Sequence, residues 1–233
     1  MIKLISFKNC PFVQRVTGRL EAQHVPYAIE FIQLNDKPQW FLDISPNGQV
    51  PVLMTETGTP LFESDAIIEY LDEVYGPIEA NLDPEQRAMD RAWNYQASKL
   101  YLPQCSAMSS KDKDTLEERA TNLGKVFAKV EEHLGDGPLF KGASISNVDI
   151  AWLPLLHRAD IIRKRTGYDF VDKYPKLKAW QQALMATGIA EKSVAKDFEE
   201  VFSSYYLSDK TYLGNPNAEH QGSKSSFGRD GCC

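Results

Sequence analysis

The spacing of hydrophobic and polar residues divides the chain into two parts near residue 80. Before that point, short runs of apolar, β-branched and aromatic residues predict strands, and these alternate with stretches of helical periodicity. The predicted strands are residues 2–7, 26–32, 49–54 and 60–62, and the main predicted helices begin after Cys10 and after Glu63. This order predicts an α/β domain that opens with a βαβ unit.

From residue 84 to residue 207 the apolar residues recur with helical spacing only. Asp83 followed by Pro84 is typical of an N-cap and a first helical position. Further on, Ser146 and Asp149 match a capping box in which Asp takes the place of Glu, so we give Asp149 a structural role. The sequence therefore predicts an all-helical second domain.

The expected domain limits follow from these two patterns. We place the first domain at residues 1–76, a linker at 77–83 and the helical domain at 84–207. Gly, Ser, Asn and charged residues dominate residues 208–233, which predicts a polar C-terminal tail. Its last residues, Cys232 and Cys233, do not form a prenylation box, so we interpret the tail as an exposed end that is not lipid-anchored.

Composition excludes several classes of function. The 233 residues carry a net charge of −6, and the basic residues are scattered, which argues against a nucleic-acid partner. The chain begins directly with a strand-like run and has no apolar stretch of about 18 residues, so we expect a cytoplasmic protein without a membrane span. Four cysteines in a chain of this length do not form a disulfide framework, which favours a reducing compartment.

One of these cysteines stands where the first predicted strand meets the first helix. Pro11 follows Cys10 at a position where the first turn of a helix tolerates proline, which places Cys10 at the helix N-terminus. Unpaired N–H groups and the helix dipole stabilise a thiolate at such a position and make it nucleophilic at neutral pH. The alternative is that Cys10 is a small apolar residue packed beneath the sheet.

This opening resembles the thioredoxin and glutaredoxin superfamily, with one difference. Val13 stands where a second cysteine would complete a C-x-x-C pair. A mixed disulfide formed at Cys10 would therefore need an outside thiol to resolve it.

Several dispersed motifs extend the resemblance over residues 1–207. They are Cys-Pro-Phe at 10–12, Asn-Asp-Lys-Pro-Gln-Trp-Phe at 35–41, Gly-Gln-Val-Pro-Val-Leu at 48–53, Glu-Ser at 63–64 and Ser-Asn-Val-Asp at 146–149. Together they resemble the glutathione transferase superfamily, in particular its cysteine-type members of the omega class and related bacterial branches. The resemblance implies a thioredoxin-like N-terminal domain with a mixed four-stranded sheet and a C-terminal helical bundle domain.

The resemblance also implies a role for each residue of a glutathione site. Lys37 would bind the glycine carboxylate, and Val50, held by a cis-Pro51, would pair its backbone with the cysteinyl unit. Glu63 would pair with the amine of the γ-glutamyl end, while the hydroxyl and N–H of Ser64 would bind the α-carboxylate at a helix start.

Phe12 would line the same site through its backbone and ring. Structural alternatives stay open for the other residues. Lys37 fits a solvated surface lysine, Pro51 a strand-edge residue, and Ser64 or Asp65 a helix N-cap that stabilises by about 1 kcal/mol. No histidine spacing suggests a metal site.

These residues favour a glutathione-dependent thiol transferase with a cysteine nucleophile. The resemblance implies mixed disulfides, dehydroascorbate or glutathionyl conjugates as substrates, and a homodimer. Two alternatives are a transferase that conjugates glutathione to electrophiles and a non-enzymatic binding or regulatory module of the same fold. Conjugation needs a hydroxyl that holds the glutathione thiolate, and a cysteine at that place favours a covalent disulfide instead.

Overall fold

The computed structural model describes residues 1–217, so Cys232 and Cys233 lie outside the described part. The first domain consists of β1 (Ile2–Ser6), α1 (Pro11–Ala22), β2 (Tyr27–Phe31), α2 (Gln39–Ile44), β3 (Val52–Met54), β4 (Pro60–Phe62) and α3 (Ser64–Tyr75). Its strands form one sheet in the order β2-β1-β3-β4, with β1 parallel to β2 and antiparallel to β3. This mixed four-stranded sheet with its helices is a thioredoxin-like domain, as the sequence predicted.

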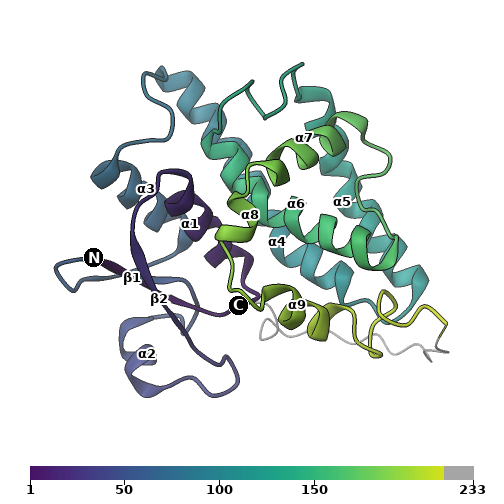
Figure 1. Cartoon of the computed structure of the whole chain (residues 1–233), viewed down its shortest axis with the longest axis horizontal. Coiled ribbons are helices and arrows are strands. Elements are labelled where there is room, and N and C mark those ends of the chain that lie inside the picture. Colours follow the sequence, from purple (N-terminus) through teal and green to yellow (C-terminus); the bar gives the residue numbers. More distant parts are fainter. Residues whose placement is uncertain (218–233) are drawn as a thin grey trace.

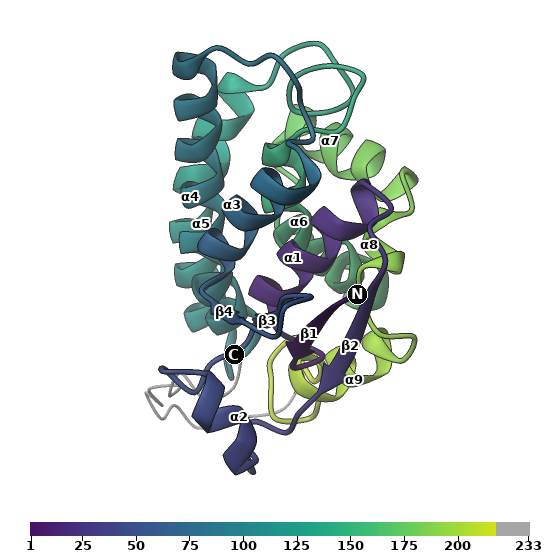
Figure 2. The ribbon, with the colours of Figure 1, turned by 90° about the vertical axis from the view of Figure 1, so that its left-hand side faces the viewer.

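The core of this domain forms where the apolar stripes of α1 and α3 meet the sheet. Val16 and Leu20 of α1 and Leu71 of α3 are fully buried in one cluster with the β1 and β3 side chains. Phe41 of the short α2 is buried in the same cluster. In two perpendicular views α1 lies between β1 and the second domain (Figures 1 and 2).

The second domain is entirely helical in the described residues. It consists of α4 (Pro84–Met108), α5 (Lys113–His133), α6 (Asn147–Thr166), α7 (Pro175–Ala186), α8 (Ile189–Lys192) and α9 (Phe198–Tyr206). The helix α6 is buried along most of its length, from Val148 to Ile162. It occupies the centre of the domain because α1, α4 and α7 all pack against it.

The capping box predicted at the start of α6 is present and extends further than the sequence showed. The Asp149 carboxylate is fully buried and accepts hydrogen bonds from the Ser146 N–H at 2.8 Å and hydroxyl at 2.6 Å. It also accepts from the Phe140 N–H at 3.0 Å and from Trp180 Nε1 at 2.6 Å. Asp149 therefore connects α6, α7 and the preceding loop.

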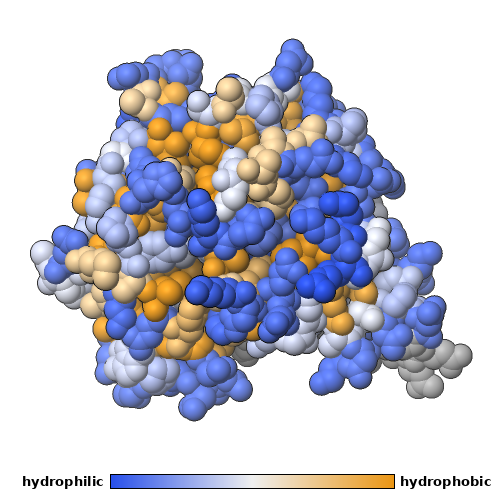
Figure 3. All heavy atoms as spheres, in the orientation of Figure 1, coloured by the Kyte–Doolittle hydropathy of each residue, from blue (hydrophilic) through white to orange (hydrophobic). Residues whose placement is uncertain are grey.

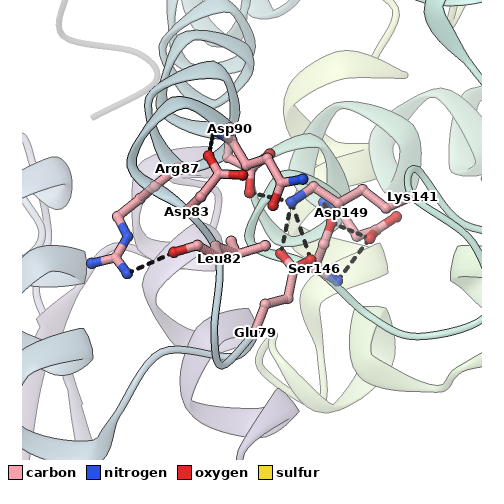
Figure 4. Close-up of polar contacts among 9 residues, drawn as sticks. Glu79, Leu82, Asp83, Arg87, Asp90, Lys141, Ser146 and Asp149 are labelled. Atoms are coloured by element: carbon pink, nitrogen blue, oxygen red, sulfur yellow. Dashed lines mark hydrogen bonds and ion pairs between the residues drawn. The ribbon is translucent and has the colours of Figure 1, made fainter.

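A second polar cluster holds the segment between the domains (Figure 4). The Lys141 ammonium lies between the carboxylates of Glu79, at 3.1 Å, and Asp90. Burial lowers the pKa of Lys141, but hydrogen bonds and charge from Asp90 and Glu79 outweigh burial and raise it. Asp83 caps α4 as predicted, with its carboxylate accepting from the Gln86 N–H at 2.8 Å.

The stretch predicted as a tail begins as part of the packed domain. Leu213 is buried in the helical core, and the Tyr212 N–H donates to the Ser110 carbonyl at 2.8 Å. The two large apolar residues of this otherwise polar stretch explain the difference, since they gain free energy by leaving water.

The surface is mostly hydrophilic on the face in Figure 3, with apolar side chains exposed in patches between charged ones. Within residues 1–217 no helix has the length and apolar character that a membrane crossing requires.

Candidate active site

Cys10 is the N-cap residue of α1, where the sequence placed it. Its backbone is extended (φ −71°, ψ 120°), Pro11 occupies the first helical position, and the side chain is 1% exposed. The Cys10 N–H donates to the Phe7 carbonyl at 3.0 Å, which fixes a tight turn between β1 and α1. In this structure Cys10 is held in a disulfide, so thiol chemistry at this position requires the reduced protein.

A cis peptide bond between Val50 and Pro51 lies opposite Cys10, as the sequence predicted. The Cys10 sulfur is 3.8 Å from the Val50 carbonyl oxygen. The preceding turn is held by Ser45, whose hydroxyl accepts from the Gln49 N–H at 3.0 Å and donates to the Gln49 carbonyl at 2.9 Å. The loop before β3 is therefore fixed next to the start of α1.

The start of α3 forms the next wall of the site. The structure corrects the predicted cap: α3 begins at Ser64, and its N-cap is Glu63, not Ser64 or Asp65. Glu63 has a φ of 67°, a conformation that costs a non-glycine residue free energy and that is concentrated at functional sites. Its Oε1 accepts a hydrogen bond from Asn47 Nδ2 at 3.1 Å.

These elements enclose a pocket of about 180 Å³. Its lining residues are Phe12, Ser45, Asn47, Gln49, Val50, Pro51, Phe62, Glu63, Ser64 and Leu102. Five of the six residues predicted to bind glutathione are therefore brought together, the exception being Lys37.

Lys37 is half-buried at the edge of this pocket and is not one of its lining residues. A Cβ built on Gly48 would lie 4.0 Å from Lys37 Nζ, so the ammonium sits over the loop that supplies Asn47 and Gln49. Gly48 itself has a φ of 58°, which favours glycine in this turn.

Behind α1, a buried polar cluster joins the two domains. Gln14 Oε1 accepts from Arg158, and Gln14 Nε2 donates to His157 Nδ1 at 2.8 Å and to the Ser193 hydroxyl at 3.2 Å. Burial, with a smaller contribution from the Arg158 charge, lowers the pKa of His157 to about 3. His157 is therefore neutral at physiological pH and accepts at Nδ1.

Sequence reasoning missed several residues of the site and its surroundings. Asn47 and Leu102 line the pocket, and Gln14 and Arg158 form the cluster behind it. Asn47 lies in a Ser-Pro-Asn-Gly stretch typical of a turn, which does not by itself indicate a pocket, and Leu102 lies on α4, where an apolar residue indicates core packing equally well. Cys105 on α4 is buried and, like Cys10, is held in a disulfide in this structure.

Among residues 1–217 no cluster of three or more His, Cys, Asp or Glu side chains is suited to hold a metal ion. The site combines a buried cysteine at a helix N-terminus with a pocket that has polar groups along its walls, and Cys10 itself is not one of the lining residues.

The fold and the site define a two-domain protein with a single cysteine at the start of its first thioredoxin-like helix. Family models described as "Glutathione S-transferase, N-terminal domain" and "Glutathione S-transferase, C-terminal domain" match residues 9–74 and 67–187. The chain belongs to the glutathione S-transferase family.

The relatives of this chain include glutathione S-transferases of the omega class, the branch that the sequence motifs resemble. Glutathione S-transferase omega-1 of Rattus norvegicus is 31% identical over 91% of this chain and 83% of its own length. Probable glutathione S-transferase DHAR1, cytosolic, of Oryza sativa subsp. japonica is 31% identical over 76% and 80%. Among solved structures, glutathione transferase Omega 3C from Trametes versicolor is similar with a TM-score of 0.73 and 25% identity, covering 88% of this chain and 89% of that one.

Proposed function

We propose that this protein is a glutathione-dependent thiol transferase in which Cys10 is the nucleophile. The observation that carries the proposal is the position of Cys10, at the N-terminus of α1 and across from the cis Val50–Pro51 bond at the pocket wall. A thiolate at a helix N-terminus is stabilised by the helix dipole and by unpaired N–H groups.

The reaction proceeds in two exchanges. The Cys10 thiolate attacks the glutathionyl sulfur of a mixed disulfide, the substrate S–S bond breaks, and the other half leaves as a thiolate that takes up a proton. A glutathione thiolate then attacks the glutathionylated Cys10, which releases oxidised glutathione and regenerates the Cys10 thiolate. In this cycle glutathione is the resolving thiol, since Val13 leaves Cys10 without a C-x-x-C partner. The disulfide that holds Cys10 in this structure must be reduced before the cycle starts.

The pocket supplies partners for each end of glutathione under this proposal. Val50 offers its backbone to the cysteinyl unit, and the start of α3 at Ser64 binds the γ-glutamyl carboxylate. Glu63 pairs with the amine, and the Lys37 ammonium, over the Gly48 loop, pairs with the glycine carboxylate. Phe12 lines the pocket next to these groups.

The test is turnover of a small glutathionyl mixed disulfide by the reduced protein, with intact mass recorded. Wild type is expected to turn over and to carry one glutathione that reductant removes, and Cys10→Ser to lose both properties. The matched control is Cys105→Ser, a buried cysteine on α4, which keeps both. An inactive wild type, or a Cys10→Ser variant that conjugates aromatic electrophiles as well as or better than wild type, would overturn the proposal.

We also propose a homodimer in the cytoplasm. Exposed apolar side chains on the neighbouring helices α3 and α4, including Val74, Met89 and Tyr95, support a partner surface there. The similarity to a rice relative whose name includes "cytosolic" supports the compartment. Light scattering after gel filtration is expected to give twice the mass of 26.3 kDa, and fractionation to place the protein with cytoplasmic markers.

A further inference from the structure

Arg158 on α6 is a fully buried cation without an acidic partner in the described part of the chain. Its side chain donates to the Pro154 carbonyl at 3.1 Å, to the Gln14 amide oxygen, and to the Asn9 carbonyl at 2.9 Å. The guanidinium carbon lies 5.4 Å from the centre of the Phe198 ring. All of these contacts are neutral, so within residues 1–217 no Asp or Glu forms an ion pair with Arg158.

The two other buried arginines near α1 are paired. Arg15 is 2.5 Å from Asp65, and Arg19 is 2.8 Å from Asp72. Burying a cation without an opposite charge is energetically unfavourable. Burial lowers the pKa of Arg158 to about 10, so it still carries its charge at neutral pH.

Arg158 contacts the turn that carries Cys10. The Asn9 carbonyl that accepts from Arg158 belongs to the peptide group whose nitrogen is that of Cys10. Arg158 therefore holds the turn on which Cys10 lies, and its charge is directed to the peptide group that precedes the nucleophile. The same charge also acts on Tyr101, whose ring contacts Phe12 of the pocket at 5.0 Å between centroids.

We propose that Arg158 is a positioning residue for Cys10, whose uncompensated charge stabilises the Cys10 thiolate while its hydrogen bond fixes the preceding turn. This inference rests on the proposed function and names a second source of thiolate stabilisation besides the helix N-terminus. Formation of the thiolate supplies the negative charge that Arg158 otherwise lacks.

Among the ionisable groups around this turn, Arg158 is the buried charge without an ion-pair partner in residues 1–217, and the remaining unpaired charge, Glu63, is exposed to solvent. Those on the elements packed against the turn are Lys8 and Asp197, Arg15 and Asp65, Tyr101, Tyr206, His157 and the exposed Glu63. The first four form two ion pairs, each at 2.5 Å. The two tyrosines, whose pKa values burial raises, and His157 are neutral at pH 7.

The test measures ionisation of Cys10 directly. In a full-length Cys105→Ala, Cys232→Ser, Cys233→Ser background, the reduced protein is alkylated with iodoacetamide across a pH series, and intact mass gives the rate. Arg158→Met removes both charge and donors, whereas Arg158→Gln keeps a donor for the turn. Both variants are expected to raise the thiol pKa by about one unit or more.

Arg19→Met is the matched control, because it removes an equally buried arginine of α1 that is paired with Asp72. It is expected to lower stability without moving the thiol pKa. The acidic limb of the pH profile of kcat/KM for thiol transfer is expected to shift in parallel with alkylation in the Arg158 variants.

A thiol pKa unchanged in Arg158→Gln, or raised equally in Arg19→Met, would overturn the inference, and circular dichroism confirms that the variants compared are folded. If Arg158→Met does not fold, Arg158→Gln alone decides. The alkylation measurement of the Cys10 thiol pKa does not depend on enzymatic turnover. A wild type without thiol-transfer activity, but with the pKa shift present, would therefore overturn the proposed function and leave this inference standing.

Discussion

Gln14 on α1 and His157 on α6 share a hydrogen bond of 2.8 Å between Nε2 and Nδ1, inside the contact between the two domains. Because Arg158 can only donate, it fixes the Gln14 oxygen on its own side and turns the amide nitrogen toward His157. His157 must therefore present an unprotonated Nδ1. Its ring also stacks on Phe198 with centroids 5.4 Å apart, and His157 is only 6% exposed, so an imidazolium there would be poorly solvated.

The first prediction is a loss of stability in mild acid. Burial lowers the pKa of His157 to about 3 in the folded chain, against 6.5 for an ordinary histidine. Above pH 6.5 both states are neutral. Below it the unfolded chain binds a proton that the folded chain does not, so stability falls as pH falls toward 3. The loss is about 2 kcal/mol at pH 5, measured by urea unfolding.

His157→Gln is expected to flatten this dependence between pH 6.5 and 5. The matched variant is His24→Asn, which replaces an exposed histidine at a positive φ by a residue that tolerates that conformation. It should keep the slope of wild type. If both variants show the same pH dependence of the unfolding free energy as wild type, protonation of His157 is not the cause of the loss of stability.

The second prediction concerns the buried carboxylate of Asp149. Asp149→Ala leaves the Phe140 N–H, the Trp180 indole N–H and the Ser146 N–H without their acceptor. Each buried donor left unpaired costs about 1–3 kcal/mol, so unfolding free energy should fall by at least about 3 kcal/mol. Asp136→Ala, an exposed position in the loop before α6, should change it little.

The same variants separate stability from chemistry. Under the structural role assigned here, folded Asp149→Ala protein should show the alkylation pH profile of wild type at Cys10. A shifted profile would mean that Asp149 influences the site as well as the fold.

The sequence was most informative where structure is decided within a few residues. Asp83, Pro11 and the Ser146–Asp149 box mark helix starts, because capping is a contact between near neighbours. The cis bond before Pro51, which the family resemblance implied, is present as well.

The sequence did not predict contacts between elements that are far apart along the chain. Arg158 meets Asn9 across 149 positions, and no periodicity relates the two. Glu63 was not predicted as an N-cap because its positive φ opposes the conformational preference of a non-glycine residue. Leu102 joins the pocket only because α4 packs beside α1.

The third prediction tests the cation at the pocket edge. Lys37→Ala is expected to weaken glutathione binding about tenfold, the loss of one charge-assisted hydrogen bond of about 1.4 kcal/mol, with kcat for thiol transfer little changed. Calorimetry on the reduced protein measures the affinity. Lys129→Ala, which removes an exposed lysine of α5, should bind as wild type. Equal affinities in all three proteins would assign Lys37 to the solvated surface.

The last prediction separates strain from function at Glu63. Its φ of 67° is tolerated by glycine, so Glu63→Gly should relieve strain and raise the free energy of unfolding by about 1 kcal/mol. The same change removes the carboxylate proposed to pair with the glutathione amine, so affinity should fall about tenfold. Glu63→Gln keeps the strain and loses the charge, and should therefore lose affinity without gaining stability. A Glu63→Gly protein that binds glutathione as tightly as wild type would show that the amine is held elsewhere, and one no more stable than Glu63→Gln would show that this conformation costs the fold nothing.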